Sequence, residues 1–139
     1  MFPTCFVCGP LREEEDGLRI FAGSVDDRGD TVAAPWTPGS ALAEDSGAVR
    51  SEFVWAALDC PGAFAIGLEG GRVLVLGRLT ARLAGEVRAG EPHVVLAWPI
   101  GAQGRKHFAG SAIFGPSGQL CASARAVWID IGASPKTAT

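Results

Sequence analysis

The chain has 139 residues, of which 47% are hydrophobic and 19% are charged, and its formal net charge at pH 7 is -3. This composition predicts one domain with a well-filled core and excludes a largely disordered chain. The acidic balance, with cations scattered apart from Arg105-Lys106, argues against a nucleic-acid-binding protein, and no apolar run is long enough to span a membrane. The N-terminus has no basic region followed by an apolar one, so we expect a cytoplasmic protein whose cysteines are thiols.

The first part of the chain predicts an irregular segment, a hairpin and a loop. Residues 1–16 have no regular pattern, whereas residues 18–22 alternate in polarity as a strand does. Residues 31–36 indicate a second strand, and the acidic, glycine-containing run at 26–30 is typical of a turn between the two. Residues 37–48, rich in Pro, Gly, Ser and Ala, predict a loop.

Residues 51–60 predict one central helix. The segment is apolar nearly all round, as a helix embedded in protein should be, and Ser51 stands where an N-cap is expected. Pro61-Gly62 would kink or end this helix, and residues 63–68 would resume it.

The second half of the chain predicts antiparallel strands. We expect them at residues 73–83, 93–100, 106–114 and about 120–131. Two strands, one helix and three or four further strands predict an α+β fold, in which an antiparallel sheet of five to six strands wraps around one central helix. We expect residues 1–139 to form a single domain with a loose tail from about residue 132. One helix cannot cover a long sheet, so the outer face or an edge would meet a second subunit.

Asp59 is the only charged residue between Glu52 and Glu69. A carboxylate is costly to bury in so apolar a run unless it has a partner. One interpretation is structural, with the carboxylate satisfied by a nearby N–H group or Arg at the end of the helix. The other is chemical, because an apolar pocket raises the pKa and the basicity of a carboxylate.

Cys5 and Cys8 form a Cys-x-x-Cys pair. The remaining cysteines, Cys60 and Cys121, lie far apart and do not form the second pair that a zinc knuckle would have. A redox motif would open a helix, which Gly9-Pro10 opposes. We interpret the pair as two small thiols that pack the N-terminal segment, and their role stays open. We predict no metal site and no cofactor.

The opening Cys5-Phe6-Val7-Cys8-Gly9, the run Asp16-Gly17-Leu18-Arg19-Ile20 and the order of the elements resemble the hotdog-fold acyl-CoA thioesterase superfamily over roughly residues 5–131. In its phenylacetyl-CoA-type branch the helix opens with His-Gly-Gly, and an acidic residue follows nine positions after that His. Asp59 matches the acidic position, whereas Arg50-Ser51-Glu52 stands in place of His-Gly-Gly.

The resemblance implies a homodimer that can pair further into a tetramer, with the active site at the dimer interface. It also implies hydrolysis of an acyl-CoA thioester, with Asp59 as general base or nucleophile and the N–H groups near Ser51 and Glu52 facing the carbonyl oxygen. We predict that the oxyanion and substrate pocket contains Arg50, Ser51, Glu52 and Trp55.

Two further interpretations of the charged residues stay open. Arg105 and Lys106, at a glycine-rich turn, would bind the phosphates of coenzyme A, although solvated turn charges are the commoner case. Arg50 and Glu52 would equally suit an exposed first turn, where the helix dipole favours Glu.

Two alternative functions remain at this point. The departure from His-Gly-Gly favours a non-catalytic acyl-CoA-binding protein with the same fold. A hydratase or dehydratase on this fold is the second alternative, but no His lies between Met1 and Gly90 to serve it.

Overall fold

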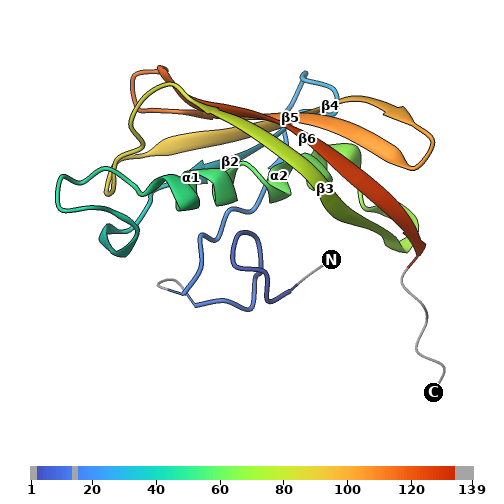
Figure 1. Cartoon of the computed structure of the whole chain (residues 1–139), viewed down its shortest axis with the longest axis horizontal. Helices are drawn as coiled ribbons and strands as arrows, with labels where there is room; N and C mark the ends of the chain where they lie inside the picture. The colour runs from blue at the N-terminus through green and yellow to red at the C-terminus, as the bar shows by residue number, and fades with distance from the viewer. Residues whose placement is uncertain (1–2, 14–15, 134–139) are drawn as a thin grey trace.

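The computed structural model describes residues 3–13 and 16–133 of the chain. A six-stranded antiparallel sheet with the order β1-β2-β4-β5-β6-β3 curves over one side of a helical segment (Figure 1). The strands are β1 Gly23–Ser24, β2 Val32–Trp36, β3 Arg72–Leu83, β4 His93–Gln103, β5 Lys106–Phe114 and β6 Leu120–Ala133. The helices are α1 Ser51–Ala57 and α2 Cys60–Ile66, with short 3-10 turns η1 Ser40–Leu42 and η2 Glu69–Gly71. The predicted α+β arrangement of a sheet around one central helical segment is confirmed.

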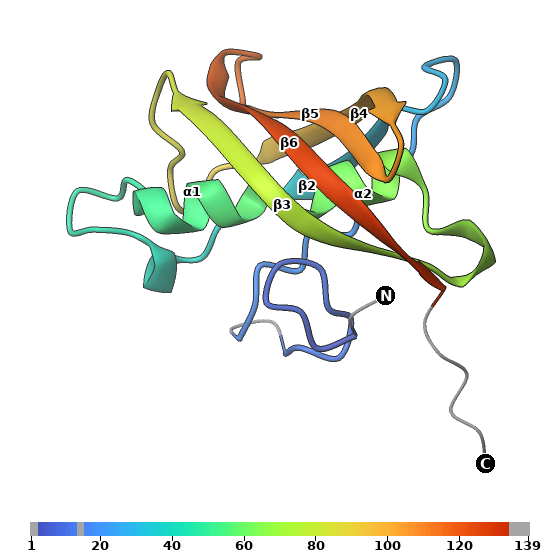
Figure 2. The same cartoon turned by 45° about the vertical axis from the view of Figure 1, so that its right-hand side comes forward.

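The helical segment is covered on two sides, which explains why its sequence is apolar nearly all round. The sheet lies on one side, and the irregular N-terminal segment passes beneath the other (Figures 1 and 2). Val54 and Leu58 share one buried cluster with Val7 from that segment and Ile113 from the sheet. The N-terminal cysteines are therefore carried to the helices.

The predicted strand at residues 18–22 is wrong. The N–H groups of Leu18 and Ile20 donate to the carbonyls of Phe6 and Val7 at 2.8 and 2.9 Å, and Arg19 has a φ of 53° that interrupts an extended run. The alternation in the sequence is real, since Leu18 and Ile20 are both buried, but it arises from packing on the helices. The hairpin itself is confirmed, and its first strand is only the two residues of β1, which pair with β2.

The helix predicted at residues 51–60, with a kink or break at Pro61-Gly62 and a continuation over residues 63–68, is present, but the predicted position of the break is wrong. The break falls at Leu58 and Asp59, and Pro61 stands in the first turn of α2. The ring of Pro61 would clash with the carbonyl of the residue four positions earlier in a continuous helix, whereas the first turn of a new helix tolerates proline. Ser51 is the first residue of α1, and the N-cap position belongs to Arg50, whose side chain makes no capping hydrogen bond.

The four later strands confirm the predicted ones, with β4 extending to Gln103. β3 is twelve residues long and forms one edge of the sheet, so one row of its backbone groups has no neighbouring strand among the described residues. Val75 and Leu76 on it are each 37% exposed. A long apolar edge of this kind is suited to pairing with another chain. No helix in the described part of the chain combines the length and apolar character that a membrane crossing requires.

Candidate functional site

Asp59 lies at the break between the two helices and faces a pocket of about 240 Å³. The N-terminal segment, α2, β3 and β6 supply its walls. The lining residues are Cys5, Cys8, Asp59, Cys60, Ala63, Phe64, Leu74, Val75, Leu76 and Trp128. The wall is mostly apolar, with three thiols and one carboxylate. The pocket is slightly smaller than the roughly 300–1,000 Å³ of common ligand sites, so it has room for an acyl group and not for a whole coenzyme A.

The carboxylate of Asp59 lacks the partner that a structural role would require. Its Oδ1 atom is buried and accepts no hydrogen bond within the described residues. The side chain does not cap α2, although Asp59 occupies the N-cap position. Burial raises the pKa of this carboxyl above its ordinary value, because the charged form loses hydration. The N–H group or Arg that the structural interpretation requires is therefore not found at Oδ1 among the described residues.

A buried donor lies in the same pocket. Trp128 Nε1 is the other buried side-chain polar atom without a partner in the described part of the chain. It rests against Gly62, where an added Cβ would come within 3.1 Å of it. Buried polar atoms without partners are rare in folded proteins, and here an acceptor and a donor both belong to residues of one pocket. That coincidence marks the pocket as the candidate site.

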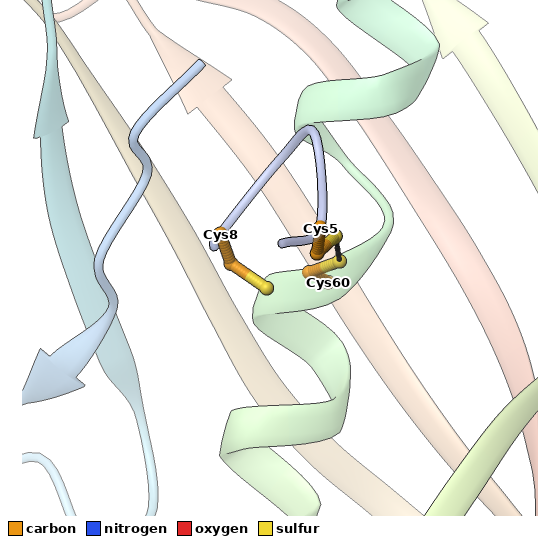
Figure 3. Close-up of side chains that lie close together, drawn as sticks. All are labelled: Cys5, Cys8 and Cys60. Atoms are coloured by element: carbon orange, nitrogen blue, oxygen red, sulfur yellow. Dashed lines mark hydrogen bonds between the residues drawn. The ribbon is translucent and has the colours of Figure 1, made fainter. Parts of the chain in front are cut away.

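The three thiols of the pocket form a compact group. The sulfur atoms of Cys5, Cys8 and Cys60 lie within 4.8 Å of one another, and the Cys5 and Cys60 sulfurs are 3.5 Å apart (Figure 3). A hydrogen bond from the Cys60 thiol is the main cause that lowers the pKa of Cys8 to about 6, despite the opposing effect of burial. The pKa of Cys60 is raised for the complementary reason, together with its burial.

No sequence pattern indicates that Cys60 lies beside Cys5 and Cys8. Cys60 is 55 residues from Cys5, so no motif spacing links them. The available signal was the apolar alternation of Leu18 and Ile20, which anchors the N-terminal segment on the helices. Cys121, by contrast, is buried in the main core cluster and lies outside the pocket.

The other predicted pocket residues lie elsewhere on the chain. Arg50, Ser51, Glu52 and Trp55 are exposed on the first turns of α1, and none of them lines the Asp59 pocket. The rise of α1 puts Ser51 roughly 12 Å from Asp59 along the helical segment. The N–H groups of Ser51 and Glu52 make no hydrogen bond to any described residue, whereas those of Phe53 and Val54 donate to the Arg50 carbonyl. A single copy of the chain therefore does not bring the two sets of residues together.

The predicted phosphate-binding residues are exposed. Arg105 and Lys106 lie at the turn between β4 and β5, away from the lining of the pocket. A second, cationic hollow of about 290 Å³, which no sequence pattern indicates, is lined by Arg78, Thr80, Phe108, Arg125 and Val127. Strand alternation places it on the face of the sheet opposite to the helices, since the neighbouring Ala126 and Trp128 pack against Ala63 of α2. The Arg125 guanidinium lies 5.7 Å from the centre of the Phe108 ring.

The two histidines do not contribute to the pocket. His93 is buried, with Nδ1 2.8 Å from the Glu91 carbonyl and Nε2 accepting from the Arg88 N–H at 3.4 Å. His107 lies on β5 and is not among the lining residues. A function that needs histidine beside Asp59 therefore has no support here.

No protein-family model matches the sequence, and no curated protein matches it. Solved structures do match. A thioesterase superfamily protein has a TM-score of 0.73 at 20% sequence identity, over 86% of this chain and 62% of that chain. The E. coli PaaI protein, from the phenylacetic acid degradation operon, has a TM-score of 0.73 at 16% identity, over 84% of this chain and 83% of its own. A Streptococcus mutans UA159 protein bound to acetyl CoA has a TM-score of 0.68 at 12% identity, over 81% and 88% of the two chains.

Identities this low establish the fold alone. The chain has the hotdog fold of these thioesterase superfamily structures, and the predicted resemblance is confirmed at that level. The chain spans 62% of the length of the first of them, so the activity of that larger protein does not carry over as a finding.

Proposed function

We propose that the protein is a thioester hydrolase that acts on an acyl-CoA, with the acyl group in the apolar pocket and Asp59 as its catalytic carboxylate. The observation that carries this proposal is the partly buried Asp59, whose Oδ1 atom has no partner within the described residues, in an otherwise apolar pocket of a hotdog fold. A carboxylate whose pKa is raised by burial is a stronger base than an exposed one.

The reaction follows from that arrangement. Asp59 takes a proton from a water molecule, and the water oxygen attacks the thioester carbonyl carbon. The tetrahedral intermediate then collapses, the carbon–sulfur bond breaks, and the departing thiolate takes the proton back from Asp59. In the alternative route the Asp59 carboxylate itself attacks the thioester carbonyl and expels the thiolate, which forms a mixed anhydride that water then hydrolyses at the Asp59 carbonyl carbon. Single turnover in ¹⁸O-labelled water separates the two routes, because only the second leaves label in the Asp59 side chain.

A second copy of the chain would complete the site. The N–H groups of Ser51 and Glu52 have no acceptor among the described residues, but α1 separates them from Asp59 within one copy. The pocket runs along β3, the long edge strand. A homodimer that pairs or packs at this edge would cover the pocket and could bring in the partner's α1, in line with the interface site that the resemblance implies. Further pairing into a tetramer would use the outer face of the sheet.

Coenzyme A is the proposed carrier of the acyl group. The hotdog protein from Streptococcus mutans was solved with acetyl CoA, which supports this class of ligand for the fold. Arg105 and Lys106 are exposed cations that can reach phosphate groups outside the pocket. In a dimer whose active sites lie at the interface, they would serve the partner's site.

A non-catalytic acyl-CoA-binding protein is the second candidate. The observation that favours it is the exposed Arg50-Ser51-Glu52 run at the start of α1, where the thioesterase pattern has His-Gly-Gly. Such a protein would bind acyl-CoA tightly and release no thiol. A hydratase or dehydratase is disfavoured because no histidine lines the pocket.

Release of free thiol from a panel of short, long and aryl acyl-CoA substrates tests the proposal. We expect turnover by the wild type and a loss of about 10²–10⁴-fold in Asp59→Asn, which keeps the shape of the side chain but cannot accept a proton. Asp45→Asn is the matched control, because Asp45 is exposed in the loop before α1. Equal turnover in Asp59→Asn and wild type would remove Asp59 from the chemistry. Binding without turnover by the wild type would establish the second candidate.

A further inference from the structure

Three cysteine sulfurs with no role in the proposed hydrolysis lie together on one wall of the pocket. They come from two separate parts of the chain, since Cys5 and Cys8 belong to the N-terminal segment and Cys60 begins α2 (Figure 3). We propose that Cys5, Cys8 and Cys60 bind one Zn²⁺ ion, whose fourth ligand position is left to a water molecule or a group from the pocket.

The spacing of the sulfurs fits a tetrahedral ion. Zinc–thiolate bonds of about 2.3 Å at tetrahedral angles put neighbouring sulfurs about 3.8 Å apart. The Cys5 and Cys60 sulfurs are 3.5 Å apart, and all three lie within 4.8 Å of one another. Small rotations of the side chains would thus bring all three to one ion. Among the described residues no fourth His, Cys, Asp or Glu atom joins the group, so one coordination position stays open.

The loop that carries Cys5 and Cys8 is built to hold both sulfurs on one side. The Gly9 N–H donates to the Cys5 carbonyl at 2.8 Å and closes the turn. A Cβ at Gly9 would lie 2.5 Å from the Cys5 backbone nitrogen and 2.7 Å from the Pro3 carbonyl, so only glycine fits. Val7, between the two cysteines, is buried in the core cluster and anchors the loop. The two-residue spacing of the cysteines is common among structural zinc ligands.

The charge of the site also favours a cation. Asp59 lies beside the thiols in the same pocket, and its Oδ1 atom has no hydrogen-bond partner in the described part of the chain. Thiolates added to an unpaired carboxylate would accumulate negative charge in an apolar wall, which is costly unless a cation offsets it. A disulfide would join two of the sulfurs and leave the third without a role. A divalent metal ion that prefers sulfur ligands would bind all three thiolates and would cross-link the N-terminal segment to α2.

Metal content and Co²⁺ spectroscopy test this proposal on the whole chain. We expect about one Zn²⁺ per chain after dialysis against metal-free buffer. Replacement by Co²⁺ should give a sulfur-to-cobalt charge-transfer band and the intense visible bands of a tetrahedral site. Cys5→Ser, Cys8→Ser and Cys60→Ser should each lower the Zn²⁺ affinity by at least about tenfold, since even changes around the ligands cost that much.

Cys121→Ala is the matched control, because this fourth cysteine is buried in the core and does not belong to the sulfur group. It should keep the metal and the cobalt spectrum. Cys8→Ser decides the question if Cys60→Ser fails to fold by circular dichroism, because Cys8 lies in the irregular segment and not in α2. The proposal is overturned if the reduced wild type binds no Zn²⁺, if it isolates with a disulfide among the three cysteines, or if the Cys121 variant loses the metal equally. These measurements need no substrate, so their outcome is independent of the hydrolase proposal.

Discussion

The two ends of α1 differ in almost every physical respect. At its start, Ser51 and Glu52 are exposed, and their backbone N–H groups have no partner among the described residues. Just past its end, Asp59 lies in an apolar pocket beside three thiols. The sequence resemblance joins these two ends in one site, whereas a single copy of the chain keeps them roughly 12 Å apart. Either a second copy unites them, or only the far end of the helix does chemistry.

After Asp59→Asn, the largest expected effect comes from removing the N–H group at the start of α1. Ser51→Pro deletes that donor, and Arg50 already has φ -61° and ψ 143°, a conformation that suits the residue before a proline. If the N–H group stabilises the oxyanion, Ser51→Pro should lower kcat by about 10²–10³-fold. Ser51→Ala, which keeps the N–H group, should stay within about threefold of the wild type by the same thiol-release assay.

Mixing the two inactive variants sharpens the result. If one copy supplies the N–H group and its partner supplies Asp59, a heterodimer of Ser51→Pro and Asp59→Asn contains one intact site, so activity should return after subunit exchange. Full activity in Ser51→Pro would instead assign the chemistry to the Asp59 end alone. If both variants are inactive, and activity does not return after mixing of dimers that are shown to exchange subunits, the N–H group and Asp59 act within the same copy.

The same contrast shows what the sequence could and could not predict. The four later strands followed from length, apolar content and glycine turns, and β4, β5 and β6 are linked in order by short hairpins. The break at Asp59 was placed two residues too late. The sequence pattern predicts that proline ends the helix that contains it, whereas the ring of proline excludes helix only on its N-terminal side. That error hid the fact that Asp59 stands at a helix junction and not within a helix.

The candidate site was partly predictable. Asp59 stood out because a lone charge in an apolar run is costly. Cys60 did not stand out, because its proximity to Cys5 depends on how the N-terminal segment packs across the helices, and local patterns carry no such long-range information. Trp128 was one of four tryptophans in the sequence, and only its packing against Gly62 shows that its Nε1 lacks a partner.

Gly62→Ala tests how tightly the Asp59 end is packed. The new Cβ would lie 3.1 Å from Trp128 Nε1 and 3.2 Å from the Ala109 Cβ. Overpacking of this kind costs about 1–3 kcal/mol, and the better helix propensity of alanine returns less than about 1 kcal/mol. We expect a net loss of about 1–2 kcal/mol in the free energy of unfolding, measured by urea denaturation. Gly39→Ala, where no atom lies within 4 Å, should change little. Equal stability of both variants would mean that α2 shifts freely over β6.

Asp59→Asn should stabilise the fold of metal-free protein at neutral pH. The folded-state pKa of Asp59 is raised from 3.8, so the ionised carboxylate disfavours the folded state above that raised pKa. The amide has no charge to lose hydration, and we expect about 1 kcal/mol of added stability at pH 7. This gain should shrink as the pH falls through the raised pKa and vanish below the unfolded value of 3.8, where the Asp59 carboxyl is protonated in both the folded and the unfolded state. A gain that persists unchanged at low pH, in thermal melts with chelator present, would show that the charge is not its cause.

The smallest expected effect concerns the exposed cations, and it decides which surface meets the nucleotide. Arg105→Gln combined with Lys106→Gln should raise KM for acyl-CoA by about three- to fivefold, since exposed charges contribute about 1 kcal/mol or less. KM for acyl N-acetylcysteamine thioesters, which lack the phosphates, should not change. Arg78→Gln combined with Arg125→Gln is the matched double variant in the outer hollow. If that pair raises KM for acyl-CoA and the first pair does not, the nucleotide lies on the outer face of the sheet. The Asp59 pocket would then receive only the end of a ligand that approaches around the edge of β3.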